Sequence, residues 1–160
     1  MLKSVEPLKE IELVPKFEAL LKELLGHAPF IKLRSLTTGA RLPIASHDRA
    51  DILAQITAGK RSWTLVGQCK RLGQPREVRI AALQLARYLE HLPRDKGRYA
   101  LVLAPFISED SAQICAAEGI GYADLAGNAR LSFDHVFIET RVPAATNASC
   151  ERRKSALTSL

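Results

Sequence analysis

Three polar side chains with complementary chemistry occur in two short segments of the first half of the chain. Asp51 supplies a carboxylate, Gln68 an amide oxygen and Lys70 an ammonium group. Oxygen atoms are the ligands that Mg²⁺ prefers, so these two oxygen-bearing side chains and the Cys69 carbonyl predict a magnesium site. An ammonium group beside the ion could orient a water molecule or stabilise charge developing on a phosphate, which is the role expected of Lys70.

These residues meet only if residues 51–57 and 62–70 pair as a β-hairpin. Both segments are rich in the β-branched and aromatic residues that favour strands. The intervening Gly59 and Lys60 suit a two-residue type II′ turn, which has glycine first. That turn places Asp51 across from Gln68, with Cβ atoms about 5 Å apart.

The same register divides the hairpin into two faces. One face is wholly apolar and pairs Ile56 with Trp63, so we expect Trp63 to lie in the core. Because side chains alternate along a strand, Gln68 and Lys70 share the other face, and Cys69 points into the apolar one as a small core residue.

The remaining pattern predicts helices and strands on both sides of this hairpin. We expect helices over residues 14–25, with Pro15 in the first turn, 75–92, and from a Ser108 cap to Gly119. We expect strands over residues 30–36, 98–106, 120–125 and 130–140, and a loop over residues 37–47. This α-β-β-β-α-β-α-β-β order predicts an α/β fold, a mixed sheet flanked by helices.

Asp51, a hairpin and then Gln68-x-Lys70 resemble the PD-(D/E)xK, or restriction endonuclease-like, superfamily, and the Gln-x-Lys form is similar to its Mrr-like variant. The resemblance covers residues 14–140 and implies the αβββαβ core of a Mg²⁺-dependent DNA endonuclease. It further implies a metal-supporting glutamate on the first helix, for which Glu18 is the best match. Gln84 and Tyr88 are similar to the Gln-x-x-x-Tyr helix motif of RecB-like nucleases and are expected to support the site, or simply to pack between helix and sheet.

A second resemblance concerns residues 120–131 (IGYADLAGNARL), which are similar to a segment of bacterial regulators related to AbiEi-type antitoxins. Those regulators often carry a winged-helix DNA-binding domain after a nuclease-like one. We therefore expect residues 1–142 to form the nuclease-like domain and residues 143–160 to be a linker or tail of the kind that leads to a winged helix. Asp124 and Asn128 are expected to serve turn chemistry.

Charge and composition narrow the class of protein and partner. The 160 residues carry a net charge of +6, and residues 60–98 hold ten basic against three acidic residues, leaving a net charge of −1 elsewhere. A localised basic excess favours a polyanion such as DNA, with phosphate contacts expected from Arg71, Arg76, Arg79 and Arg87, although a solvated face has the same composition. The chain shows no membrane span, no signal peptide and no disulfide framework, which favours the cytoplasm.

Two functions fit these patterns best, and a third, less specific one is a protein-interaction domain whose basic helix binds an acidic partner. The first is a magnesium-dependent DNA endonuclease, in which Asp51 and Gln68 hold the metal. The second is a nuclease-like module without cleavage in a transcriptional regulator or antitoxin-like protein, which binds DNA or forms a homodimer. The neutral side chain of Gln68, where this superfamily usually has an acid, keeps the second function open.

Overall fold

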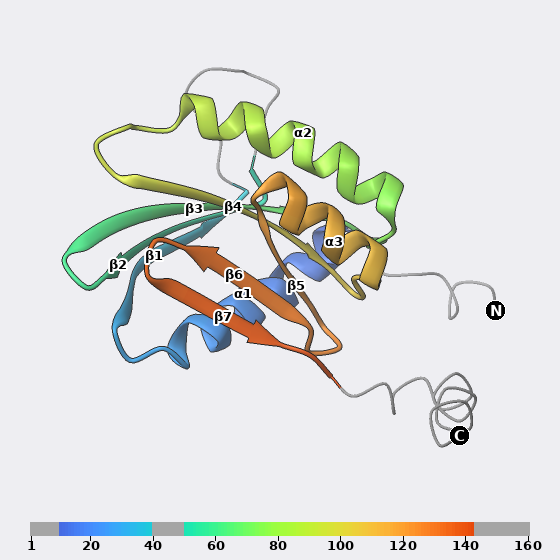
Figure 1. The fold of residues 1–160 in the computed structure, drawn as a ribbon, viewed down its shortest axis with the longest axis horizontal. Helices are drawn as coiled ribbons and strands as arrows, with labels where there is room; N and C mark the ends of the chain where they lie inside the picture. Colours follow the sequence, from blue (N-terminus) through green and yellow to red (C-terminus); the bar gives the residue numbers. More distant parts are fainter. Residues whose placement is uncertain (1–9, 40–49, 143–160) are drawn as a thin grey trace.

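The computed structural model describes residues 10–39 and 50–142, which form one seven-stranded sheet and three helices (Figure 1). In chain order the elements are α1 (Glu10–Gly26), β1 (Ile31–Thr38), β2 (Ile52–Ala58), β3 (Arg61–Cys69), α2 (Pro75–His91), β4 (Gly97–Ala104), α3 (Glu109–Glu118), β5 (Gly121–Asp124), β6 (Ala129–Phe133) and β7 (Val136–Thr140). The strands lie in sequence order across the sheet. The predicted mixed α/β architecture is confirmed.

The pairing of neighbouring strands changes twice across this sheet, from antiparallel to parallel and back. The pairs β1–β2 and β2–β3 are antiparallel, β3–β4 and β4–β5 are parallel, and β5–β6 and β6–β7 are antiparallel. The two parallel connections each contain a helix, α2 or α3, because a chain that returns to the start of a neighbouring strand needs a crossover. The carboxyl ends of β3, β4 and β5 therefore lie at one edge of the sheet.

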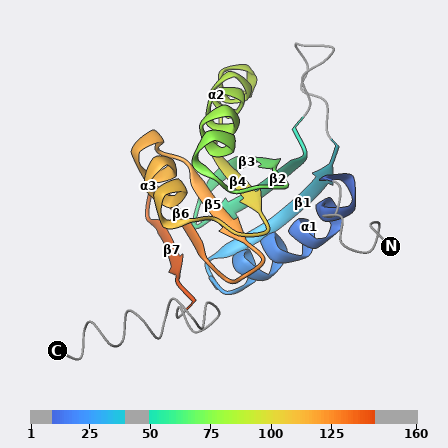
Figure 2. The ribbon, with the colours of Figure 1, turned by 90° about the vertical axis from the view of Figure 1, so that its right-hand side faces the viewer.

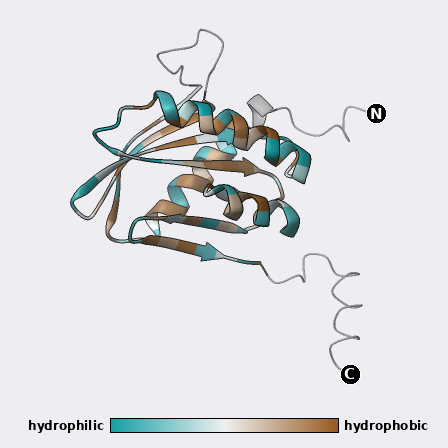
Figure 3. Cartoon of the chain, turned by 45° about the horizontal axis from the view of Figure 1, so that its top comes forward, coloured by the Kyte–Doolittle hydropathy of each residue, from teal (hydrophilic) through white to brown (hydrophobic). Residues whose placement is uncertain are grey.

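Helices cover both faces of the sheet, with α1 on one side and α2 and α3 on the other (Figure 2). Two separate apolar clusters correspond to these two layers. The larger packs α1 against alternate residues of the sheet, including Phe17 with Leu65, and the smaller packs Leu85 of α2 and Cys115 of α3 against Val66 and its neighbours. Hydrophobic residues are accordingly prominent along the strands in Figure 3. Among the described residues, no helix is long and apolar enough to span a membrane.

The helix boundaries follow local sequence at α2 and α3 but not at α1. Pro75 occupies the first turn of α2, and Ser108 caps α3 by accepting the Ser111 backbone N–H at 3.2 Å. By contrast, α1 begins at Glu10, so Pro15 lies inside the helix rather than in its first turn. Burial of Leu13 against the sheet gives the segment before the proline a packing reason to remain helical.

The central hairpin has the predicted register. Residues from Ile52↔Gly67 to Ala58↔Arg61 pair as expected, and Gly59 has a φ of 64°, which a glycine-first turn requires. Trp63 is buried as predicted, with its ring centroid 4.6 Å from that of Phe133.

The prediction of a single strand over residues 130–140 is wrong. The segment is a second hairpin, β6–β7, in which Phe133 pairs with Val136. The break comes at Asp134, whose φ of 53° lies in the left-handed region, so the strand reverses there although its apolar pattern continues on both sides.

Candidate functional site

Asp51 lies where β2 and β3 separate, at the carboxyl end of β3. Regular pairing ends at Ile52↔Gly67, one pair short of the expected Asp51–Gln68 pair. The Asp51 backbone N–H instead donates to the Gly67 carbonyl at 3.1 Å, and the Asp51 carboxylate accepts the Cys69 N–H at 2.8 Å. The carboxylate thus replaces a backbone carbonyl in the ladder, which fixes it against the Gln68–Cys69 peptide.

The three residues after Gly67 present three different groups at this strand end. Cys69 is buried in the α1 layer, as predicted, while Gln68 and Lys70 are partly exposed. Gln68 and Lys70 share strand parity with Val66, which packs in the α2 layer, so their side chains lie on that face. The Lys70 N–H donates to the Leu103 carbonyl at 2.8 Å, which fixes the strand end to β4.

The Gln68 side-chain amide oxygen is a buried hydrogen-bond acceptor. This Oε1 atom has no hydrogen-bond partner among residues 10–39 and 50–142. A buried acceptor without a partner costs about 1–3 kcal/mol, so a cation or a water molecule beside this oxygen would remove an energetic penalty. Among residues 10–39 and 50–142, His, Cys, Asp and Glu form no group of three that could hold a metal, so the site has Asp51 as its described carboxylate and Gln68 as a neutral neighbour.

The predicted supporting residues lie at different distances from this strand end. Glu18 is on α1, which packs on the opposite face of the sheet from Gln68, and its carboxylate pairs with Lys22 at 3.3 Å. Gln84 lies about 13 Å along α2 from Pro75, so it and the buried Tyr88 lie under the middle of the sheet. The Oε1 atom of Gln84 is also buried and has no hydrogen-bond partner in the described part of the chain.

The basic segment does not form one surface around the site. Lys60 is at the tip of the β2–β3 hairpin, about 30 Å along the strand from Lys70. Arg98 is at the same far end, because its strand neighbour is Thr64, and its guanidinium donates to the Leu89 carbonyl at 2.7 Å. The basic residues of segment 60–98 are therefore divided between the two ends of the sheet.

The basic residues that come next after Lys70 in the chain are exposed arginines. Arg71 comes directly after Lys70, and Arg76 lies in the first turn of α2. Arg79 and Arg87 continue along the exposed side of the same helix, away from the strand end. The described basic residues nearest to the site in the chain are thus Lys70, Arg71 and Arg76.

Asp124 has a structural role wider than the turn that its spacing predicted. Its fully buried carboxylate accepts the Asn128 backbone N–H at 2.8 Å and the Asn128 amide at 2.9 Å, which confirms the turn. It also accepts the Ile107 N–H at 2.9 Å, from the loop after β4. Because Ile107 forms a bridge with Gly73, Asp124 helps to fix the loop that follows Lys70. Sequence offered the Asp124–Asn128 spacing but no pattern that points to Ile107.

Three buried titratable groups lie elsewhere in the fold, on α3, β4 and β5. Burial raises the pKa of the Cys115 thiol to about 12 and raises the pKa values of Tyr99 and Tyr122 above 10. Cys115 therefore stays protonated at neutral pH and cannot act there as a thiolate nucleophile.

Comparisons with known proteins found endonucleases among solved structures. A repair endonuclease from Pyrococcus abyssi is 18% identical over 76% of this chain and 49% of its own, with a TM-score of 0.48. The small subunit of the heterodimeric restriction endonuclease R.BspD6I is 17% identical over 71% of this chain and 67% of its own, with a TM-score of 0.40. This chain spans about half the length of the repair enzyme. No family model and no curated relative matches the chain.

Proposed function

We propose that this chain is a DNA-interacting domain of the restriction endonuclease-like superfamily that hydrolyses phosphodiester bonds with Mg²⁺. The observation that carries the proposal is the 2.8 Å hydrogen bond between the Asp51 carboxylate and the Cys69 N–H. It brings a carboxylate, an amide oxygen and a lysine to one strand end, in the order and on the elements that the superfamily resemblance implies. The αβββαβ order of the first six elements agrees with the same assignment.

The residues at this strand end fit a magnesium ion. The Asp51 carboxylate, the Gln68 amide oxygen and the Cys69 carbonyl are all hard oxygen donors, and the buried Gln68 oxygen lacks a hydrogen-bond partner among the described residues. Mg²⁺ is commonly held by one or two carboxylates together with substrate phosphates, so a single acid is compatible with a site completed by DNA. A bound ion would polarise the scissile phosphate and offset its negative charge.

The other residues have distinct roles in this proposal. Lys70 orients the attacking water or stabilises charge that develops on the phosphate oxygens. Arg71 and Arg76 bind phosphates next to the site, and Arg79 and Arg87 extend these contacts along α2, which gives affinity without sequence reading. Glu18 is proposed as a weaker support, because it lies on the opposite layer and pairs with Lys22.

A second function is favoured by one observation. Gln68 contributes no negative charge, and no cluster of three acidic or metal-binding side chains exists among the described residues. A site with this low charge is expected to bind Mg²⁺ weakly in the absence of DNA. The alternative is a module that binds DNA without cleaving it, in a regulator or antitoxin-like protein; residues 143–160, where a link to a winged helix was expected, lie outside the described residues.

Nicking of supercoiled plasmid DNA distinguishes the two functions. Purified chain is incubated with plasmid and Mg²⁺ or EDTA, and wild type is compared with Lys70→Ala and Lys60→Ala. Lys60 is the matched control, because it is an exposed lysine at the opposite end of β3. We expect metal-dependent nicking that falls about 100-fold or more in Lys70→Ala and is unchanged in Lys60→Ala.

Two other outcomes of the nicking assay would contradict the proposed site or favour the second function. Nicking that survives Lys70→Ala would contradict the proposed site. Absence of nicking at any metal concentration, together with salt-sensitive retention of DNA on a filter, would favour the non-cleaving module.

A further inference from the structure

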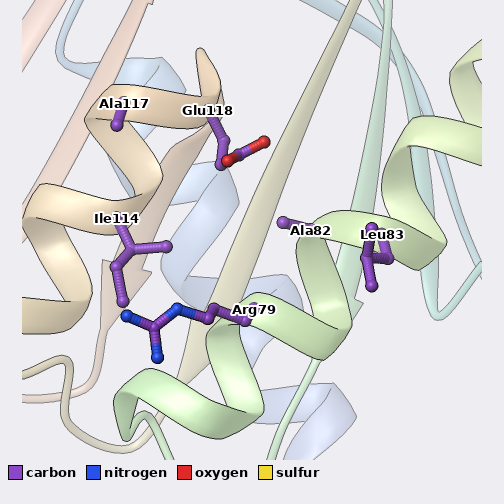
Figure 4. Close-up of a pocket in the computed structure, with 6 residues that line it drawn as sticks. All are labelled: Arg79, Ala82, Leu83, Ile114, Ala117 and Glu118. Carbon is purple, nitrogen blue, oxygen red and sulfur yellow. The ribbon is translucent and has the colours of Figure 1, made fainter.

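A groove separates α2 and α3 on the outer side of the molecule. It encloses about 290 Å³ and is lined by four apolar and two charged side chains, namely Arg79, Ala82, Leu83, Ile114, Ala117 and Glu118 (Figure 4). Alanines from both helices line it, and Leu83, 71% exposed, stands at one side. An apolar recess beside a protruding leucine is a shape to which a second apolar surface can dock.

The two charges of this groove come from opposite helices. Arg79 extends from α2 toward Ile114, and Glu118 extends from α3 toward α2 at the other end of the groove (Figure 4). Within residues 10–39 and 50–142, neither side chain has an ion-pair partner within 4.0 Å. The groove therefore carries one cation and one anion, separated from each other, around an apolar centre.

This arrangement is complementary to itself. A two-fold axis that lies in the plane of the groove, perpendicular to the line from Arg79 to Glu118, exchanges the two positions. Each Arg79 would then lie over Glu118 of the partner, which makes two symmetric ion pairs. The same axis runs across the groove, so it keeps the exposed Leu83 on the α2 side, where it faces the exposed side chains of the partner's α2, the partner's Leu83 among them.

We propose that the groove between α2 and α3 is the interface through which two copies of this chain form a two-fold homodimer. A polyanion would be repelled by Glu118, and a basic peptide by Arg79, whereas a second copy matches both charges and the leucine. Ile80, 41% exposed and one turn from Leu83, extends the apolar contact along α2. The proposal does not depend on nuclease activity, because association is expected without DNA.

The size of the groove sets the expected strength of the dimer. One recess and one exposed helix face form a surface at the small end of specific interfaces, so we expect a reversible dimer with a micromolar Kd. In this dimer Arg79 is buried at the interface and does not contact DNA. The phosphate contacts proposed above are then made by Arg71, Arg76 and Arg87.

A charge-swap series measured by sedimentation equilibrium tests the interface. The full 160-residue chain is compared with Arg79→Glu, Glu118→Arg and the double variant that carries both changes. We expect each single reversal to raise the Kd about tenfold or more, because it places like charges together twice, and the double variant to restore the Kd to within about threefold of wild type. Arg87→Glu, which makes the same charge change on α2 outside the groove, should have a much smaller effect.

Leu83→Ser tests the apolar half of the contact without threatening the fold, since Leu83 is mostly exposed. It should also weaken the dimer about tenfold. A chain that remains monomeric at the highest soluble concentration overturns the proposal. A dimer that is insensitive to Leu83→Ser, or single reversals that the double variant fails to rescue, would overturn it equally.

Discussion

Replacing Gln68 by glutamate adds a second negative charge beside Asp51 and tests whether this strand end holds a metal. The Asp51 carboxylate contacts the backbone N–H of Cys69, which is joined directly to Gln68. Side chains of cross-strand neighbours start roughly 5 Å apart, and we take this as the separation of the two carboxylates. At that distance two like charges repel by about 3 kcal/mol in a medium of effective dielectric about 20. Protonation of the new acid relieves part of this, so we expect Gln68→Glu to lower the free energy of unfolding by about 1–3 kcal/mol without metal.

Mg²⁺ should reverse the sign of this effect. With the ion bound, both carboxylates face a divalent cation instead of each other, so we expect Gln68→Glu to bind Mg²⁺ at least about tenfold more tightly than wild type. Thermal unfolding measures both effects. A loss of about 1–3 kcal/mol lowers the Tm of Gln68→Glu in EDTA by several degrees. Saturating Mg²⁺ should then raise the Tm of this variant by more than it raises the Tm of wild type. Nicking activity of the variant should rise in parallel.

Gln84→Glu is the matched control for this experiment. Its amide oxygen is also buried with no hydrogen-bond partner among the residues that the structure describes, but it lies on α2, beneath the middle of the sheet. We expect burial of the new carboxylate to destabilise this variant in EDTA as well, and we expect no rescue by Mg²⁺. Equal changes in the Tm of the two variants on addition of Mg²⁺ would refute a metal site at Asp51 and Gln68. A Gln68→Glu variant whose Tm does not rise with Mg²⁺ would refute it too.

Three further predictions concern the parts of the fold that support the site. Asp124→Ala leaves the buried Ile107 N–H and other donors without an acceptor and should cost about 3–5 kcal/mol in urea unfolding; a loss below 1 kcal/mol would contradict the role given to this carboxylate. Gly73→Ala should destabilise the chain by about 1–3 kcal/mol or more, because its Cβ would lie 2.0 Å from the Phe106 carbonyl oxygen, and Gly26→Ala, where a Cβ meets nothing within 4 Å, is the control. Burial raises the pKa of Cys115 from 9.0 to about 12, so its contribution to stability is complete below pH 9 and falls as pH rises from 9 to 12; Cys115→Ala should flatten this decline in calorimetry across that range.

The parts of this protein that sequence predicted are those set by neighbours in the chain. Glycine at position 59 selects a two-residue turn, and the alternation of apolar residues then permits one register for β2 and β3, so the approach of Asp51 to residues 68–70 follows from local geometry. The caps of α3 and the proline of α2 are equally local. Sequence could not show that the Asp51 carboxylate enters the ladder itself, because that depends on where pairing stops.

Tertiary structure decided which distant groups share a surface. The parallel order β3–β4–β5 brings Asp124 to Ile107 and Ile107 to Gly73, although nothing in the local pattern of any one segment specifies these partners. Basic residues of one short segment are separated because the strand between them, β3, carries Lys60 and Lys70 to opposite ends of the sheet. The groove between α2 and α3 exists only because both crossover helices pack on the same face, and no property of either helix alone determines that contact.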